Sequence, residues 1–78
     1  VNAVGPGTIA TELARSAVLT SDDARQRILG RTPMKRLGEP AEVAEVVAFL
    51  LSDAASYITG EIVYVDGGRR ALNYTVPV

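Results

Sequence analysis

A short apolar run that ends in Gly5-Pro6-Gly7 constrains the fold of this 78-residue chain more than any other stretch. Residues 1–4 are mostly apolar and partly β-branched, which favours a buried parallel strand. The glycines lack a Cβ and Pro6 fixes φ, so the backbone here can approach a neighbour closely. Ligands bind at the carboxyl ends of strands in open α/β sheets. The sequence therefore predicts a strand and a ligand-facing loop over residues 1–11.

The composition is that of an ordinary globular α/β protein, with 47% hydrophobic and 22% charged residues. Eight basic and nine acidic residues give a net charge of -1, which provides no electrostatic basis for binding nucleic acid or an anionic membrane. No apolar run approaches the ~20 residues of a membrane span. The chain has no Cys and no His, so it lacks disulfides and the commonest metal ligand and general base. We expect a soluble cytoplasmic protein without a metal site.

Two short helices are predicted after the loop. Residues 12–19 have good helix formers, with Thr11 as a plausible N-cap and with Leu13 and Ala17 on a common apolar face. A second helix should start at Thr20 or Ser21 and end before Gly30, and residues 31–38 should be extended. An insertion of this kind after a ligand-side strand resembles a mobile lid. A connection that merely packs on the surface explains it equally well.

The third helix, which begins at Pro40, is the most strongly indicated element. Its apolar positions form an arc of roughly 200°, which is wider than the stripe that one sheet can cover. Phe49 falls outside this arc, among polar residues. The sequence therefore predicts that the helix packs against both its own sheet and another subunit. The apolar positions recur at helical spacing: Val43, Val46, Val47, Leu50 and Ala54.

A second strand is predicted over residues 61–65, with Ile62 and Tyr64 on one face and Val63 and Val65 on the other. Strands joined by a long helical crossover are parallel, so the chain should contain a right-handed βαβ unit. Two strands alone do not make a stable sheet. The apolar tail, residues 69–78, is predicted to dock on the rest of the protein.

Taken together, these segments resemble the C-terminal third of the classical short-chain dehydrogenase/reductase family. The resemblance implies an α/β fold, namely the C-terminal βαβ part of a Rossmann-type doubly wound parallel sheet, incomplete as a stand-alone domain. No single motif is specific, but five in the right order and spacing are strong support. They are Asn2-Ala3-Val4-Gly5-Pro6-Gly7 with Thr11, Arg36-Leu37-Gly38-Glu39-Pro40-Ala41-Glu42-Val43-Ala44, Phe49-Leu50-Leu51-Ser52-Asp53, Tyr57-Ile58-Thr59-Gly60 and Val65-Asp66-Gly67-Gly68.

The family implies NAD or NADP as the cofactor. By this resemblance Pro6 and Gly7 lie beside the nicotinamide, the backbone of Ile9 bonds its carboxamide, and the Thr11 hydroxyl contacts the carboxamide or the pyrophosphate. For Thr11 alone, a plain helix N-cap is the simpler explanation. The resemblance also makes residues 12–38 a variable substrate lid. Residues 39–68 comprise the helix and the last strand. Within them, residues 40–52 and 61–65 fall where family tetramers pair their subunits, so a tetramer or a dimer is expected.

No catalytic residue is assigned within this chain. The family's catalytic Asn, Ser, Tyr and Lys would lie in sequence that precedes Val1, and no tyrosine here has a lysine four residues later. The main hypothesis is therefore the C-terminal part of an NAD(P)-dependent oxidoreductase that interconverts an alcohol and a ketone, with the remainder of the enzyme as a partner. The alternative is a truncated, non-catalytic module that associates with itself. The tyrosines considered are Tyr57, Tyr64 and Tyr74.

Overall fold

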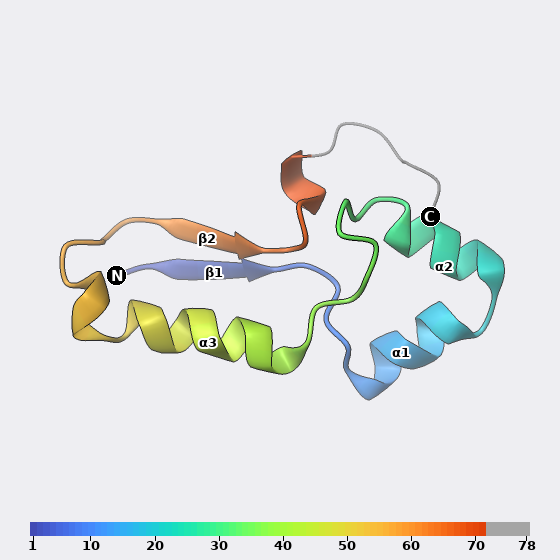
Figure 1. The fold of residues 1–78 in the computed structure, drawn as a ribbon, viewed down its shortest axis with the longest axis horizontal. Helices are drawn as coiled ribbons and strands as arrows, with labels where there is room; N and C mark the ends of the chain where they lie inside the picture. The colour runs from blue at the N-terminus through green and yellow to red at the C-terminus, as the bar shows by residue number, and fades with distance from the viewer. Residues whose placement is uncertain (72–78) are drawn as a thin grey trace.

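A computed structural model describes residues 1–71 of the chain. Three helices lie between the two strands, as the sequence predicts, and two short 3-10 helices follow α3 and β2 (Figure 1). Most of the predicted docking tail lies outside the described residues. The elements in chain order are β1 Ala3–Pro6, α1 Glu12–Leu19, α2 Asp22–Leu29, α3 Pro40–Leu50, η1 Asp53–Ala55, β2 Ile62–Val65 and η2 Arg69–Ala71.

The strands β1 and β2 pair in parallel, which confirms the predicted β-crossover-β arrangement. Their register runs from Ala3 opposite Ile62 to Pro6 opposite Val65. The strand β1 extends two residues further than predicted, through Pro6. Proline is tolerated there because the ladder bond to Val65 comes from the amide of Gly7, 3.0 Å from the Val65 oxygen. Alternation of the backbone directs the nitrogen of Pro6 away from β2.

Side-chain caps fix where α1 and α2 begin. The Thr11 Oγ1 atom accepts a hydrogen bond from the amide of Ala14 at 3.2 Å, and the Ser21 Oγ atom accepts one from the amide of Ala24 at 3.1 Å. Each cap satisfies an amide that the first turn of a helix leaves without a partner. The N-cap predicted at Thr11 is thereby confirmed, and the N-cap of α2, Ser21, is one of the two residues at which this helix was predicted to start.

The helices α1 and α2 pack against each other at the carboxyl ends of the strands (Figure 1). They hold half of the buried side chains among the described residues, namely Val18, Ala24 and Leu29. Leu13, which the sequence places on one face of α1 with Ala17, is 82% exposed. At about 100° per residue, Leu13 lies roughly 140° around the helix from the buried Val18. The buried side chains are Ala10, Val18, Ala24, Leu29, Thr32 and Ala55.

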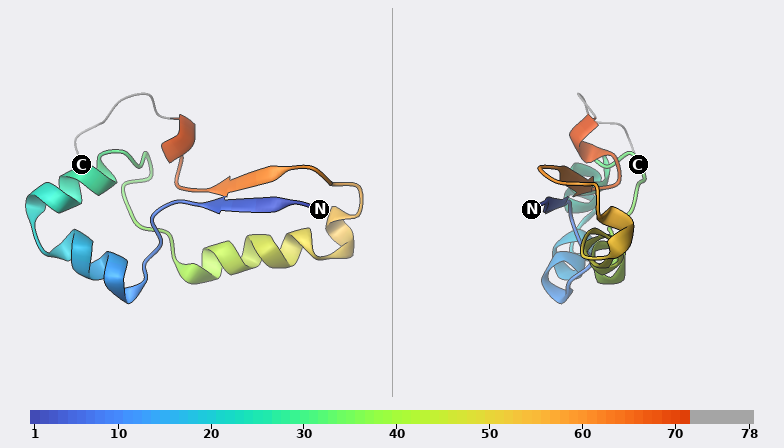
Figure 2. Two further views of the ribbon diagram at one scale, coloured as in Figure 1. Left: turned by 180° about the vertical axis from the view of Figure 1, so that it is seen from behind. Right: turned by 90° about the vertical axis from the view of Figure 1, so that its left-hand side faces the viewer.

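The helix α3 runs along one face of the two strands (Figure 1, Figure 2). Val43, Val46 and Leu50 are half-buried, and no side chain of α3 is fully buried. Phe49 and Leu51 are 46% and 83% exposed. The sheet thus covers only one side of the predicted wide apolar arc, and the exposed position predicted for Phe49 is confirmed.

The strand β2 shows the predicted alternation. Val63 and Val65 are half-buried, whereas Ile62 and Tyr64 are 56% and 45% exposed. Since α3 contacts both strands from one side, the opposite face of the sheet is open within residues 1–71. The prediction that β1 is buried is wrong for the same reason, because its residues are half-buried or exposed.

Candidate functional site

The carboxyl ends of β1 and β2 meet at one edge of the sheet, beside α1 and α2 (Figure 1). The loop of residues 7–11 leaves β1 there, and Asp66-Gly67-Gly68 leaves β2 next to it. This is the edge where open parallel sheets bind ligands. The residues predicted to bind the cofactor all come from the loop or from the last residue of β1.

Gly7 lies where the two strand ends approach each other closely. A Cβ on this residue would lie 2.8 Å from the Cα of Asp66, and the Gly7 amide donates to the Val65 oxygen at 3.0 Å. Pro6, immediately before it, is exposed. The glycine is therefore required by packing against the Asp66 backbone, and this contact fixes where the loop starts.

Ile9 forms a single parallel bridge with Gly38. The Ala10 amide donates to the Gly38 oxygen at 2.7 Å, and the Gly38 amide donates to the Thr8 oxygen at 3.0 Å. Because backbone groups alternate in direction, the N–H and C=O of Ile9 itself point away from Gly38. The Ile9 oxygen also accepts the amide of Thr11 at 2.7 Å. Sequence reasoning missed this bridge.

Thr11 is exposed at the start of α1. Its Oγ1 atom accepts the capping bond from Ala14, so the hydroxyl hydrogen remains able to donate to a ligand. The amides of the first helical turn face the same way and favour a negatively charged or oxygen-rich group. Thr11 thus combines the N-cap role with a geometry that suits ligand binding.

The turn after β2 is built by Asp66. Its Oδ1 accepts the amide of Gly68 and its Oδ2 accepts the amide of Arg70, each at 3.0 Å. Gly67 and Gly68 have φ values of 63° and 93°, which favour glycine. The Gly67 oxygen accepts the amide of Met34 at 3.1 Å. The sequence identified this turn as the end of a strand and as a family motif. It did not reveal that the turn also holds residues 31–38, the return segment between α2 and α3.

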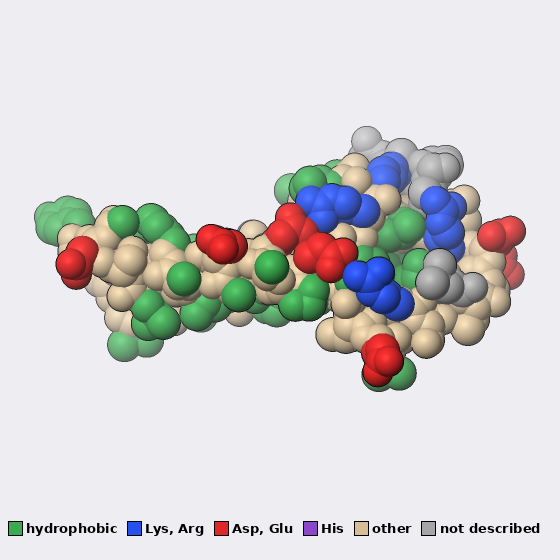
Figure 3. Space-filling model, turned by 60° about the horizontal axis from the view of Figure 1, so that its bottom comes forward, with side chains coloured by type: hydrophobic (Ala, Val, Ile, Leu, Met, Phe, Trp, Pro, Cys, Tyr) green, Lys and Arg blue, Asp and Glu red, His purple; other side chains and the backbone are tan. Residues whose placement is uncertain are grey.

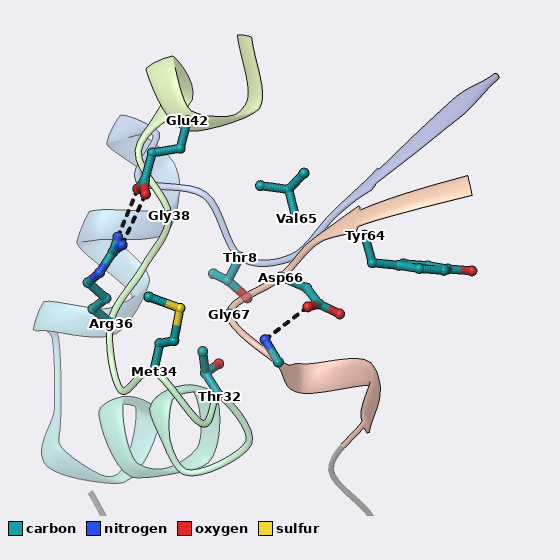
Figure 4. Close-up of a pocket in the computed structure, with 11 residues that line it drawn as sticks. Thr8, Thr32, Met34, Arg36, Gly38, Glu42, Tyr64, Val65, Asp66 and Gly67 are labelled. Carbon is teal, nitrogen blue, oxygen red and sulfur yellow. Dashed lines mark hydrogen bonds and ion pairs between the residues drawn. The ribbon is translucent and has the colours of Figure 1, made fainter. Parts of the chain in front are cut away.

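Two cavities open at this edge. The first cavity, of about 230 Å³, lies between residues 31–38 and the end of β2. Thr8, Met34 and Gly67 are in its wall (Figure 4). The other, of about 460 Å³, is lined by Pro6 and Gly7 among others. Ile9 and Thr11 line neither cavity. The structure therefore brings Pro6 and Gly7 to one cavity and places Ile9 and Thr11 on the adjoining loop.

Two ion pairs connect the α1–α2 segment, residues 12–38, to the start of α3. The Arg36 guanidinium bonds both carboxylate oxygens of Glu42 at 2.8 and 3.0 Å (Figure 4). Hydrogen bonds from Arg36 and from the Glu39 amide lower the pKa of Glu42 to about 2, and the same carboxylate raises the pKa of Arg36. The second pair joins Arg15 to Glu39 at 3.2 Å.

The described residues include few groups capable of acid-base chemistry at neutral pH. Tyr57 is fully exposed, and the ring of Tyr64 lies 4.5 Å below the guanidinium carbon of Arg70. Residues 1–71 contain no cluster of three or more side chains that could hold a metal ion. Within the same range, none of the helices combines the length and apolar character that a membrane span requires.

A family model described as Enoyl-(Acyl carrier protein) reductase matches residues 1–70 of this chain. The chain belongs to the short-chain dehydrogenase/reductase family. The match confirms the predicted family and the predicted class of fold, because the solved relatives share the architecture described above.

Three members of the family illustrate the similarity. The 3-oxoacyl-(acyl-carrier-protein) reductase FabG of Salmonella typhimurium is 53% identical over 68 residues, which are 87% of this chain and 27% of that protein. A short chain dehydrogenase family protein from Francisella tularensis matches with a TM-score of 0.77 and 38% identity, over 92% of this chain and 33% of the other. A putative 2-deoxy-D-gluconate 3-dehydrogenase from Agrobacterium tumefaciens, with bound NADP, gives a TM-score of 0.84 and 38% identity. The match covers 92% of this chain and 29% of that protein. The chain thus spans about a quarter to a third of the length of these relatives.

Proposed function

We propose that this chain is the C-terminal part of an NAD(P)-dependent oxidoreductase that interconverts an alcohol and a ketone by hydride transfer. The observation that carries the proposal is the backbone of the loop after β1. There, Ile9 directs its N–H and C=O away from the bridge to Gly38, towards the open side of the loop. The family membership and the NADP bound to one relative support the same reading.

The donor set of the loop fits a nicotinamide carboxamide. That group has one acceptor oxygen and one donor amide, and Ile9 offers one backbone donor and one backbone acceptor. The Ile9 oxygen already accepts the Thr11 amide, but a carbonyl oxygen has a second lone pair. The Thr11 hydroxyl and the start of α1 suit a carboxamide or pyrophosphate oxygen. A bound nicotinamide would supply the hydride-transfer chemistry, and in this proposal Pro6 and Gly7 form the wall beside it.

We further propose that the α1–α2 segment is the substrate lid. Its buried side chains belong to the segment itself or to the adjoining loop, so it can move without breaking a shared core. The segment starts and ends at the bridge between Ile9 and Gly38, which supplies a common hinge for both ends. Substrates of this class are small alcohols or carbonyl compounds.

The exposed apolar side chains of α3 and β2 are proposed to form contacts between subunits, in a dimer or a tetramer. Val47, Phe49, Leu51 and Ile62 are all at least 39% exposed. They lie on different sides of the molecule, because Phe49 is about 160° around α3 from Val47 and Ile62 is on the face of the sheet away from α3. Figure 3 shows hydrophobic side chains distributed along α3. Burial of such side chains between subunits stabilises an oligomer at about 25 cal/mol per Å² of apolar area.

The proposal is tested with the full-length protein by titrating NADH and NADPH and following nucleotide fluorescence. Ile9→Pro removes the outward N–H, whereas Ile9→Val keeps it and serves as the matched control. We expect the proline variant to bind at least one nucleotide several-fold more weakly, because one hydrogen bond contributes roughly 0.5–1.5 kcal/mol. Failure of the full-length protein to bind either nucleotide would refute the proposal. A protein of only these 78 residues that folds cooperatively and forms oligomers would instead favour the self-associating module.

A further inference from the structure

The ion pair between Arg15 and Glu39 joins two elements that are 24 residues apart in sequence. The Nη2 atom of Arg15 lies 3.2 Å from each carboxylate oxygen of Glu39. Arg15 is in the first turn of α1, where its amide donates to the Thr11 oxygen at 2.9 Å. Glu39 is the residue just before α3. The pair therefore connects the helical turn that carries Thr11 with the beginning of α3.

Glu39 is held at the start of α3 by a capping box. Its amide donates to the Oε1 atom of Glu42 at 2.9 Å, and its side chain accepts the backbone amide of Glu42. The Glu42 carboxylate is bonded by Nη1 and Nη2 of Arg36, which, like Arg15, belongs to the segment of residues 12–38 that we propose to move. The carboxylate of Glu39 is therefore a defined partner for Arg15. Acidic and basic side chains gather at this junction (Figure 3).

We propose that Arg15 and Glu39 are positioning residues for cofactor binding, a role that rests on the proposed function. The pair holds the first turn of α1 at one orientation, and this turn carries the Thr11 hydroxyl and the free amides of the helix start. Neither Arg15 nor Glu39 needs to touch the nucleotide. When the pair is broken, Thr11 keeps its capping bond to Ala14, but the turn as a whole is less well oriented towards the ligand.

A simpler electrostatic effect makes the opposite prediction for one of the two residues. NAD and NADP are anionic. Loss of the Arg15 charge therefore weakens binding in both explanations, because it removes an attraction to the nucleotide and also removes the ion pair that positions the first turn of α1. Loss of the Glu39 charge removes a repulsion, and direct electrostatics therefore predicts tighter binding for Glu39→Gln. The positioning role predicts weaker binding for the same variant. The sign of the Glu39 effect separates the two explanations.

The experiment uses the full-length protein and measures the Kd for NADPH and NADH at low and at high salt. The variants are Arg15→Gln, Glu39→Gln and the double charge exchange Arg15→Glu with Glu39→Arg. Both partners are about half exposed, at 54% and 53%, so we expect each single variant to raise the Kd by up to about fivefold, as suits an exposed pair. The exchange should restore the Kd to within about twofold of the original, and salt should reduce all these differences.

Two control variants each remove one charge of the same sign as Arg15 or Glu39 at an exposed position outside the ion pair. Arg25→Gln acts on an exposed position of α2, and Glu45→Gln acts on an exposed position of α3. Thermal unfolding of every variant shows whether a change in Kd follows a loss of stability. Unchanged or tighter binding by Glu39→Gln, or an Arg15→Gln effect equal to that of Arg25→Gln, would overturn the positioning role while leaving the proposed function intact. A full-length protein that binds neither nucleotide would overturn both.

Discussion

Replacement of Gly7 by alanine tests the close contact between the two strand ends. The new Cβ would lie 2.8 Å from the Cα and 2.9 Å from the Cβ of Asp66. Carbon atoms at ordinary contact are about 3.5–4.0 Å apart, so one strand end has to move by more than half an ångström. The obstacle is the backbone of Asp66. It is held in place because the Asp66 carboxylate accepts hydrogen bonds from the amides of Gly68 and Arg70. It cannot move out of the way by a change of rotamer.

The expected loss of stability follows from two opposing terms. Overpacking of this kind destabilises by about 1–3 kcal/mol. Alanine also restricts the unfolded chain more than glycine does, which offsets about 0.4–1 kcal/mol. We therefore expect Gly7→Ala to lower the free energy of unfolding by about 1–2 kcal/mol. In a domain of about 150–250 residues each kcal/mol corresponds to about 2–4 °C in Tm, so the shift should be several degrees.

Gly5→Ala is the matched control, because it places the same substitution two residues earlier, on β1. Its Cβ would meet the ring of Tyr64 at 2.8 Å, but this ring is a side chain that is 45% exposed and can rotate outwards. Thermal unfolding of the full-length protein should therefore show little change for Gly5→Ala and a clear loss for Gly7→Ala. Nucleotide binding should weaken only in the second variant. Equal Tm values for Gly7→Ala and the unmodified protein would refute the reasoning.

Three further predictions address the helix cap, the exposed face of α3 and the Glu42 carboxylate. Thr11→Val should destabilise by about 1 kcal/mol through loss of the cap and should raise the Kd for NAD(P)H severalfold, whereas Thr11→Ser should retain both properties; equal affinity of the two variants would contradict the proposed contact. Phe49→Glu should reduce the mass measured by light scattering, because it places a charge on the proposed subunit interface; an unchanged mass counts against that interface. The pKa of Glu42 is lowered from 4.5 to about 2, so its contribution to stability should be complete above about pH 4.5 and disappear as the pH falls through about 2. NMR titration of the carboxyl carbon checks this value, and Arg36→Gln should return it towards 4.5.

Local features of the fold could be predicted from the sequence because they depend on neighbouring residues. The caps at Thr11 and Ser21 each act over three residues, and the alternation in β2 needs only four. The parallel pairing followed from the length and helical content of the crossover. These features are set by short-range chemistry, so one sequence was sufficient to indicate them.

Contacts that depend on the path of the chain could not be predicted in the same way. The bridge between Ile9 and Gly38 and the pair between Arg15 and Glu39 span 29 and 24 residues, and neither has a periodic signal. Helical periodicity alone likewise does not say which side of α1 meets α2, and Leu13 lies on an exposed side. The motif that contains Arg36, Gly38 and Glu39 was noted by resemblance, but its physical role became clear only from these contacts.

The kinds of contact at the two ends of the site differ, and this difference indicates which part moves. The ends of β1 and β2 are held together by close backbone packing, in which the absence of a Cβ on Gly7 is essential. The α1–α2 segment has its own buried side chains. It is joined to the strand ends by hydrogen bonds, among them the bridge at Gly38 and the bond from the Met34 amide to the Gly67 oxygen, and by packing of Thr32 and Pro33 against Gly67 and Gly68. Exposed ion pairs and hydrogen bonds open at a smaller free energy than packed backbone does. We therefore propose that the strand ends form a fixed wall for the ligand, and that the proposed lid opens at the α1–α2 segment, which must separate from Gly67 and Gly68 as it moves.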